Sequence, residues 1–279
     1  MYKGEVQRDQ YESAPGERWS KLRNMRKSPL HYQHGIRCAP AATDALRIGG
    51  AIHCAVLEPE FFAARYVTYA ESKCKGEGAR KRWEEFQAAH RHMVILEPDE
   101  LRRVHEVAAA VRAHPEARPL LAKGRPEVPL TWTDAVTGIT CKCRLDWVTP
   151  KHQSVELKSA LNIEAHSFAN MAWKYGYFHQ VEHYAAGLGK QIGKTSEEIE
   201  SFVIAVESSP PYDVCVYCPD DESLYAAREE LAGIMSRLAQ CRRTNIWPGR
   251  YPEKTFLTAP RYVLDSEEDD WQVTERKGA

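Results

Sequence analysis

The segment CKCRLDWVTPKHQSVELKSA, residues 141–160, decides the fold predicted for this chain. Its two apolar runs flank a short polar turn, a pattern that predicts a β-hairpin. Side chains alternate between faces along a strand, so Glu156 and Lys158 point to one side and Leu157 points into the core. Asp146, near the end of the preceding strand, is then placed to meet Glu156 across the ladder. Two carboxylates that converge with a lysine suit a hard divalent cation and an anionic substrate, the chemistry of phosphodiester hydrolysis.

The spacing of these three charged residues is not specific by itself. Acidic and basic side chains also alternate on many solvated strands, so a structural interpretation competes with the catalytic one. The rest of the chain must decide between them.

The regions around the hairpin alternate between helical and strand patterns. Residues 43–57, 83–92, 98–113, 164–189 (interrupted near Gly176) and 221–242 have helical spacing, and residues 128–133, 140–148, 154–158, 201–207 and 214–217 have strand spacing. This order predicts an α/β fold with a single mixed central β-sheet flanked by helices. We expect one domain over residues 1–279, with a helical part at about 18–122, a catalytic core at about 123–243 and a tail at 244–279.

Composition excludes several classes of protein. The chain has 279 residues and a formal net charge of −1. It has no apolar run long enough to cross a bilayer and no N-terminal signal pattern, so we expect a cytoplasmic protein without a membrane partner. The eight cysteines then indicate free thiols, and the Cys215/Cys218 pair has no second pair at metal-ligand spacing. A basic loop at residues 73–82 suits a polyphosphate, although a solvated loop is an equal alternative, and residues 265–270 are acidic.

Four further residues are candidates to join the charged trio. His53 follows Gly49 and Gly50 in its helix and could reach a metal through a ring nitrogen, or it could be a core histidine bonded to a backbone carbonyl. Gln180 and Tyr184 are four residues apart, so they share one helical face. Glu127 begins the strand before Asp146 and is either a third carboxylate or a surface edge residue.

Together these residues resemble the PD-(D/E)xK nuclease superfamily, and most closely its exonuclease VIII (RecE-type) branch, which is related to lambda exonuclease and to RecB nuclease domains. The likeness spans about residues 20–262. The matching blocks, in order, are residues 28–32, 43–61 with 65–67, 141–147, 156–158, 175–180 with Tyr184, and 205–212. One departure is Leu145, which replaces the proline of the "PD" motif. The other is Glu156, where many relatives have aspartate.

The resemblance implies a role for each matching residue. Asp146 and Glu156 match the metal-binding acids, the backbone carbonyl of Leu157 would bind the same ion, and His53 matches the histidine that approaches it. Lys158 matches the catalytic lysine, and Gln180 with Tyr184 matches the helix motif that supports the site. The residue that grips a terminal phosphate is not identified, and Arg23, Ser28, Arg144 and the basic loop near Arg80 are candidates.

The same resemblance implies an activity and partners. We expect an Mg²⁺- or Mn²⁺-dependent exonuclease that degrades linear double-stranded DNA from 5′ to 3′ in phage-type or prophage-type homologous recombination. A ring-shaped homo-oligomer and a single-strand annealing recombinase are the implied partners. Two alternatives remain open: a non-catalytic DNA-binding or assembly protein on a nuclease fold, and a single-strand nuclease module of another DNA-processing system.

Overall fold

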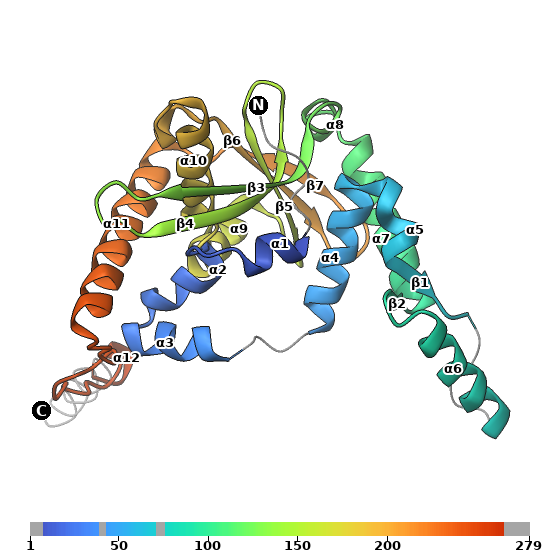
Figure 1. Ribbon diagram of the computed structural model, residues 1–279, viewed down its shortest axis with the longest axis horizontal. Coiled ribbons are helices and arrows are strands. Elements are labelled where there is room, and N and C mark those ends of the chain that lie inside the picture. Colours follow the sequence, from blue (N-terminus) through green and yellow to red (C-terminus); the bar gives the residue numbers. More distant parts are fainter. Residues whose placement is uncertain (1–7, 39–42, 71–75, 265–279) are drawn as a thin grey trace, which may run out of the picture.

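The computed structural model describes residues 8–38, 43–70 and 76–264. Its centre is a five-stranded sheet in the order β3-β4-β5-β6-β7 (Figure 1). The strands are β3 (Arg125–Thr133), β4 (Thr140–Val148), β5 (Ser154–Ala160), β6 (Ser201–Glu207) and β7 (Val214–Tyr217). β5 and β6 are parallel, and the other neighbouring pairs are antiparallel. The structure therefore confirms the predicted α/β architecture with one mixed central sheet.

Local chemistry explains the β3–β4 hairpin. At the turn, Oδ1 of Asp134 accepts a hydrogen bond from the backbone N–H of Thr137 at 2.8 Å. Gly138 follows with a φ of 69°, a left-handed conformation that glycine adopts without steric cost. β3 begins three residues earlier than predicted, so Glu127 lies inside the strand rather than at its start.

Helices cover both faces of the sheet. On one face, α4 (Asp44–Leu57) and α7 (Pro98–Ala113) share an apolar cluster with Leu157 and Ile204. On the other face, α10 (Tyr177–Ile192) packs Ala185 and Leu188 against β3 and β4. α9 (Ala165–Tyr175) ends at Gly176, where the predicted interruption of the helix occurs. The long α11 (Asp221–Thr244) contacts α10.

An N-terminal helical segment is fastened to the sheet. It comprises α1 (Arg8–Ser13), α2 (Trp19–Leu22), the 3-10 helix η1 (Arg23–Arg26) and α3 (Pro29–Arg37). Glu17 forms an isolated parallel bridge with Cys141. The ammonium group of Lys142, whose side chain is buried, donates to the backbone carbonyls of Tyr11 (2.8 Å), Glu12 (3.1 Å) and Ala14 (2.7 Å). These contacts satisfy a buried cation entirely with backbone oxygens, so they hold the segment in place.

The remaining elements lie around this core. They are η2 (Pro59–Phe61), α5 (Phe62–Arg65), β1 (Tyr66–Thr68), α6 (Glu77–Ala89), β2 (Val94–Leu96), α8 (Ala117–Leu121), η3 (Ser196–Glu198) and α12 (Arg261–Leu264). β1 and β2 form a separate two-stranded parallel sheet, which the sequence did not predict.

The prediction for the basic loop was wrong where the structure describes it. Arg80 and Lys81 lie inside α6, which begins at Glu77 and ends at Ala89 rather than spanning 83–92. Ion pairs one helical turn apart favour this helix, from Arg80 to Glu84 at 3.2 Å and from Lys81 to Glu85 at 4.0 Å. Residues 73–75 of the predicted loop and the acidic segment 265–270 lie outside the described residues.

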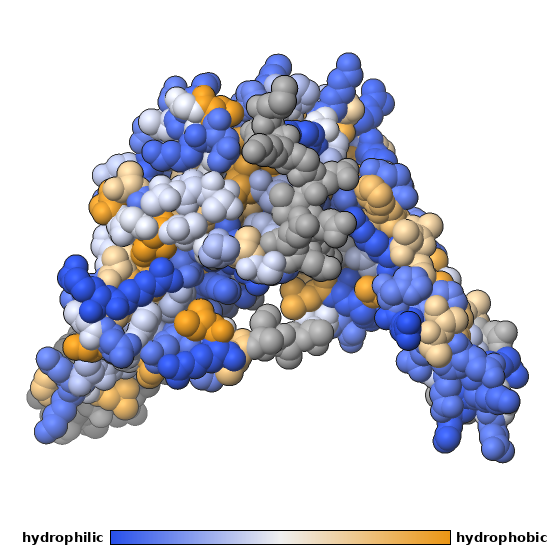
Figure 2. Space-filling view, viewed as in Figure 1, coloured by the Kyte–Doolittle hydropathy of each residue, from blue (hydrophilic) through white to orange (hydrophobic). Residues whose placement is uncertain are grey.

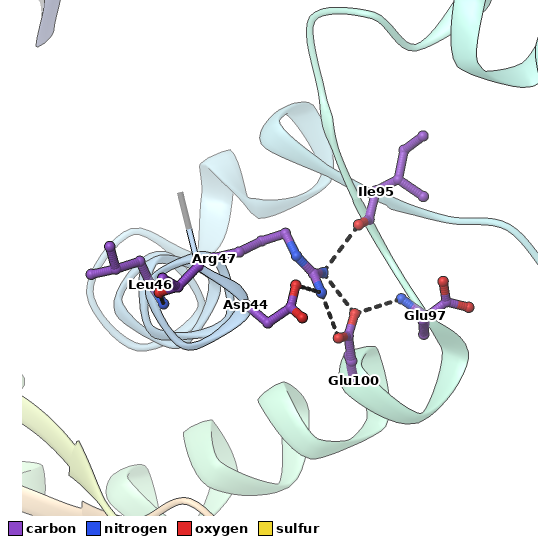
Figure 3. A network of polar contacts seen from close by, with 7 residues as sticks. Asp44, Leu46, Arg47, Ile95, Glu97 and Glu100 are labelled. Carbon is purple, nitrogen blue, oxygen red and sulfur yellow. Dashed lines mark hydrogen bonds and ion pairs between the residues drawn. The ribbon is translucent and has the colours of Figure 1, made fainter. Parts of the chain in front are cut away.

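A polar network joins α4 to α7 (Figure 3). The guanidinium of Arg47 donates to both carboxylate oxygens of Glu100, at 2.7 and 2.6 Å, and also to Asp44 at 3.1 Å and the carbonyl of Ile95 at 3.2 Å. Oε2 of Glu100 also accepts from the backbone N–H of Glu97, which caps α7. The network fixes the helix that carries His53.

The whole molecule has the outline of an arch. Below the sheet, α3 and α11 form one leg, and α4, α7 and α6 form the other (Figure 1). The space between the legs stays hollow in the space-filling view, where the surface of both legs is mainly hydrophilic (Figure 2). No helix in the described ranges is both long and apolar enough to cross a membrane. The cysteines in those ranges are free thiols.

Candidate active site

The candidate site forms where β4 and β5 separate. Pairing between the two strands consists of Trp147 with Val155 and Val148 with Ser154. The next residues in register, Asp146 and Glu156, do not form a ladder pair. Instead, Oδ2 of Asp146 accepts a hydrogen bond from the backbone N–H of Leu157 at 2.9 Å. The predicted ladder pair is therefore not formed, because the ladder ends one residue before the two carboxylates, although Asp146 still lies close enough to Glu156 to repel its charge.

Three side chains from different elements converge at this point. Candidate ligand atoms of His53, Glu127 and Asp146 all lie within 4.8 Å of one another. Nδ1 of His53 is 3.5 Å from Oδ2 of Asp146. Ligand bonds of about 2.1 Å place opposite ligands of an octahedral ion about 4.2 Å apart, so these atoms can reach one ion. One imidazole and two carboxylates fit Mg²⁺ or Mn²⁺.

Glu127 owes its position to an unusual backbone conformation. Its φ is 51°, a left-handed value that non-glycine residues seldom adopt. By the register of β3 and β4 it stands opposite Asp146, but these two residues are not ladder partners, whereas the pairs on either side of them are. Its Oε2 lies 2.5 Å from Nε of Arg144. Backbone strain of this kind concentrates at functional sites, and here it brings a third carboxylate to the cluster.

A second group lies directly beside the first. Glu156 is buried, and its Oε2 lies 2.5 Å from Nζ of Lys158 and accepts from Nε2 of Gln180 at 2.6 Å. The other oxygen, Oε1, is buried without a hydrogen-bond partner in the described part of the chain. Buried polar atoms rarely lack a partner. An orphaned carboxylate oxygen beside a three-ligand cluster fits a site built to receive a cation or its bound water.

The electrostatics of the two acids differ. Burial opposes ionisation of Asp146, but the pull of His53, of Lys158 and of the Leu157 N–H together lowers the pKa of Asp146 below its ordinary value. Burial, and then repulsion from Asp146, raises the pKa of Glu156, although Lys158 and His53 act in the opposite sense. The same surroundings therefore shift the pKa values of the two carboxyl groups in opposite directions, and they favour the ionised form of Asp146.

The surroundings raise the pKa values of both basic groups. Burial disfavours the charge of Lys158, but Glu156 and Asp146 outweigh it and raise the pKa of Lys158 above its ordinary value. Burial likewise opposes protonation of His53, and Asp146 raises the pKa of His53 in spite of it. A permanently charged Lys158 can position a nucleophile and offset negative charge, but it cannot accept a proton.

The structure thus brings together most of the predicted residues, in two groups. His53, Glu127 and Asp146 form the cluster, and Glu156 belongs instead with Lys158 and Gln180. Leu157 is buried in the core, as predicted. Arg144 reaches the cluster through Glu127. Burial raises the pKa of Tyr184 well above its ordinary value, and Glu156 and Asp146 add to this increase.

Two of the candidates for phosphate binding, Ser28 and Arg23, are not among the residues of these two groups. The hydroxyl of Ser28 caps α3 by accepting from the backbone N–H of His31, and it also contacts Nδ1 of that residue at 2.6 Å. Arg23 is exposed on η1.

Sequence reasoning did not single out Tyr177, although the residue lies in one of the quoted blocks. Its ring lies 5.0 Å below the ammonium group of Lys158. No spacing rule relates position 158 to position 177, so only the packing of α10 on β5 could reveal the contact.

Known proteins resemble this chain at two levels. The family described as a PDDEXK-like domain of unknown function (DUF3799) matches residues 19–258. A crystal structure of a presumed exonuclease from Eubacterium rectale is similar in fold, with a TM-score of 0.61 and 12% sequence identity, covering 94% of this chain and 98% of that one. At that identity the likeness shows the fold alone. No curated protein matched the sequence.

Proposed function

The chain belongs to the family of PDDEXK-like domains of unknown function (DUF3799), and on that premise we propose that it is a metal-dependent nuclease. The observation that carries the proposal is the convergence of His53, Glu127 and Asp146 beside the buried pair of Glu156 and Lys158. This arrangement offers ligands for a cation on one side and a fixed positive charge on the other. Hydrolysis of a phosphodiester bond uses both the cation and the positive charge.

The roles follow from the contacts. His53, Glu127 and Asp146 would hold the cation, and the unpartnered oxygen of Glu156 is a further candidate ligand. A divalent cation bound there would polarise the phosphate and lower the pKa of a water molecule. Lys158 would orient that water and offset the charge that builds up on the phosphate. Gln180 would fix the orientation of the Glu156 carboxylate, and with it the Glu156–Lys158 pair, through its hydrogen bond to Oε2 of Glu156.

The finer assignment rests on the sequence blocks shared with the RecE-type branch. We infer that linear double-stranded DNA is the substrate, digested from the 5′ end with Mg²⁺ or Mn²⁺ in homologous recombination. A homo-oligomeric ring and a single-strand annealing recombinase are the partners that this assignment brings with it. The surface beside the hollow between the two legs is mainly hydrophilic, as expected for contact with a polar polymer (Figure 2).

Digestion of end-labelled DNA tests the proposal. Linear duplex labelled at either the 5′ or the 3′ end is incubated with and without Mg²⁺, beside a closed circular duplex. We expect metal-dependent loss of the linear DNA, early release of the 5′ label and survival of the circle. Lys158→Met should abolish hydrolysis and keep the fold. Hydrolysis at the wild-type rate by Lys158→Met would exclude this mechanism, and DNA binding without any hydrolysis would indicate a non-catalytic protein.

A further inference from the structure

The bend between α9 and α10 is held rigidly from inside the molecule. Gly176, at the bend, has a φ of 77°, and a Cβ atom there would lie 2.3 Å from the ring of Trp19. Arg26 donates to the backbone carbonyls of Trp173 (2.9 Å) and Lys174 (3.3 Å) at the end of α9. Only glycine fits the bend, and a guanidinium fixes the chain that precedes it. The residues on either side of Gly176 therefore have defined positions.

Two tyrosines flank this glycine on the outside of the bend. Tyr177 is half-buried beneath Lys158, and Tyr175 is 49% exposed. Their ring centroids are 6.3 Å apart, with an interplanar angle of 32°. The ammonium group of Lys174 lies 5.8 Å from the ring of Tyr175. Two rings, with a lysine at each end, thus form a row that leads from the candidate catalytic lysine out to solvent.

Packing in the core explains the position of Tyr177 but not that of Tyr175. Tyr177 packs against the apolar cluster that contains Phe168 and Val203. Tyr175 belongs to none of the apolar clusters formed by the described residues, and half of its surface meets water although its backbone is fixed. A large aromatic ring displayed on a rigid bend, with a lysine beside it, has the chemistry that stacks a nucleobase and meets the adjacent phosphate.

We propose that Tyr175, backed by Tyr177, forms a stacking site for a nucleobase of the strand that enters the active site, with Lys174 contacting its phosphate backbone. The inference rests on the proposed nuclease function and adds a substrate subsite to it. It requires the bases next to the scissile phosphate to be unstacked from their neighbours, because both faces of a base inside a duplex are already covered. The site is tolerant of sequence, since every base has a π-face.

Binding of single-stranded oligonucleotides tests the site directly. Fluorescence anisotropy is measured with a labelled deoxyoligonucleotide and with an abasic oligonucleotide of the same length and charge, in Ca²⁺ so that the DNA stays intact. We expect Tyr175→Ala to weaken binding of the base-bearing strand by about 5- to 100-fold, the range for loss of one stacked base. Tyr175→Phe keeps the ring and should bind like the wild type. Tyr225→Ala, on exposed α11, is the matched control and should also bind like the wild type.

Three results would overturn the stacking site. They are unchanged binding by Tyr175→Ala, an equal loss with the abasic strand, and a comparable loss in Tyr175→Phe. Melting temperatures identify a variant that fails to fold, in which case Tyr175→Leu replaces it. Mg²⁺-dependent hydrolysis of linear duplex by the same wild-type preparation separates the two proposals. Hydrolysis without a stacking effect removes only the subsite, and a stacking effect without hydrolysis removes only the nuclease function.

Discussion

Oδ2 of Asp146 accepts a hydrogen bond from the backbone N–H of Leu157 at 2.9 Å, at the point where β4 and β5 stop pairing. A side chain thus replaces the ladder partner that Leu157 would otherwise take from β4. The same oxygen lies 3.5 Å from the His53 ring. Asp146 therefore takes part both in the separation of the two strands and in the candidate metal cluster.

Substitutions at Asp146 should separate its structural and ligand roles. Asp146→Asn keeps an acceptor oxygen for the Leu157 N–H, whereas Asp146→Ala leaves that N–H unpaired. We expect Asp146→Ala to lower the free energy of unfolding by about 1–3 kcal/mol more than Asp146→Asn, measured by urea denaturation. Both variants should lose Mn²⁺ binding in calorimetry. Equal stability of the two variants would show that the hydrogen bond to Leu157 contributes nothing.

A cation bound by Glu127 would compete with Arg144 for its carboxylate. Its Nε is 2.5 Å from Oε2 of Glu127, and both side chains are about three-quarters buried. Arg144→Met should strengthen Mn²⁺ binding by about 3- to 10-fold, because it removes a neighbouring positive charge worth roughly 1 kcal/mol. Calorimetric titration measures the effect. In the Glu127→Gln background the gain should vanish, and weaker binding by Arg144→Met alone would mean that the arginine holds Glu127 in place.

The network around Arg47 should contribute measurably to stability. Its two-pronged contact with Glu100 joins α4 to α7, so Arg47→Ala should lower the free energy of unfolding by about 1–2 kcal/mol. Arg102→Ala is the control, because its pair with Asp99 is exposed and should contribute less than about 0.5 kcal/mol. Thermal unfolding compares the two. A similar loss in both variants would contradict a special role for Arg47.

The burial of His183 predicts that the free energy of unfolding falls in acid. Burial lowers its pKa to about 4, and its neutral Nε2–H donates to the backbone carbonyl of Lys142 at 3.2 Å. The unfolded chain has the ordinary value near 6.5, so it binds more protons than the folded one between these two values. The contribution of His183 is complete above about pH 6.5 and is lost as the pH falls toward 4, by about 3 kcal/mol.

His183→Gln removes this titration and can still donate to the carbonyl. The free energy of unfolding of the variant, measured between pH 4 and 7, should therefore fall less steeply with acid than that of the wild type. Parallel curves for the two proteins would show that His183 does not titrate in this way.

Much of the fold follows from local pattern. Alternation along residues 154–160 correctly placed Leu157 in the core with Glu156 and Lys158 on the other side. The interruption at Gly176 was also visible, because glycine adopts the left-handed backbone conformation found there without steric cost. The extent of α6 was misjudged, since Arg80 and Lys81 have the composition of a basic loop and only their pairing with Glu84 and Glu85 favours a helix.

The sequence by itself determined which residues carry charge, which of them share a face of a strand or helix, and that strands and helices alternate around one sheet. Only the tertiary structure decided that Glu127 joins His53 and Asp146, and that Glu156 pairs with Lys158 and Gln180 instead. Periodicity acts over a few residues and reports the direction of a side chain within its own element. The distance between side chains of different elements depends on where strands separate and how helices pack, which no local spacing contains.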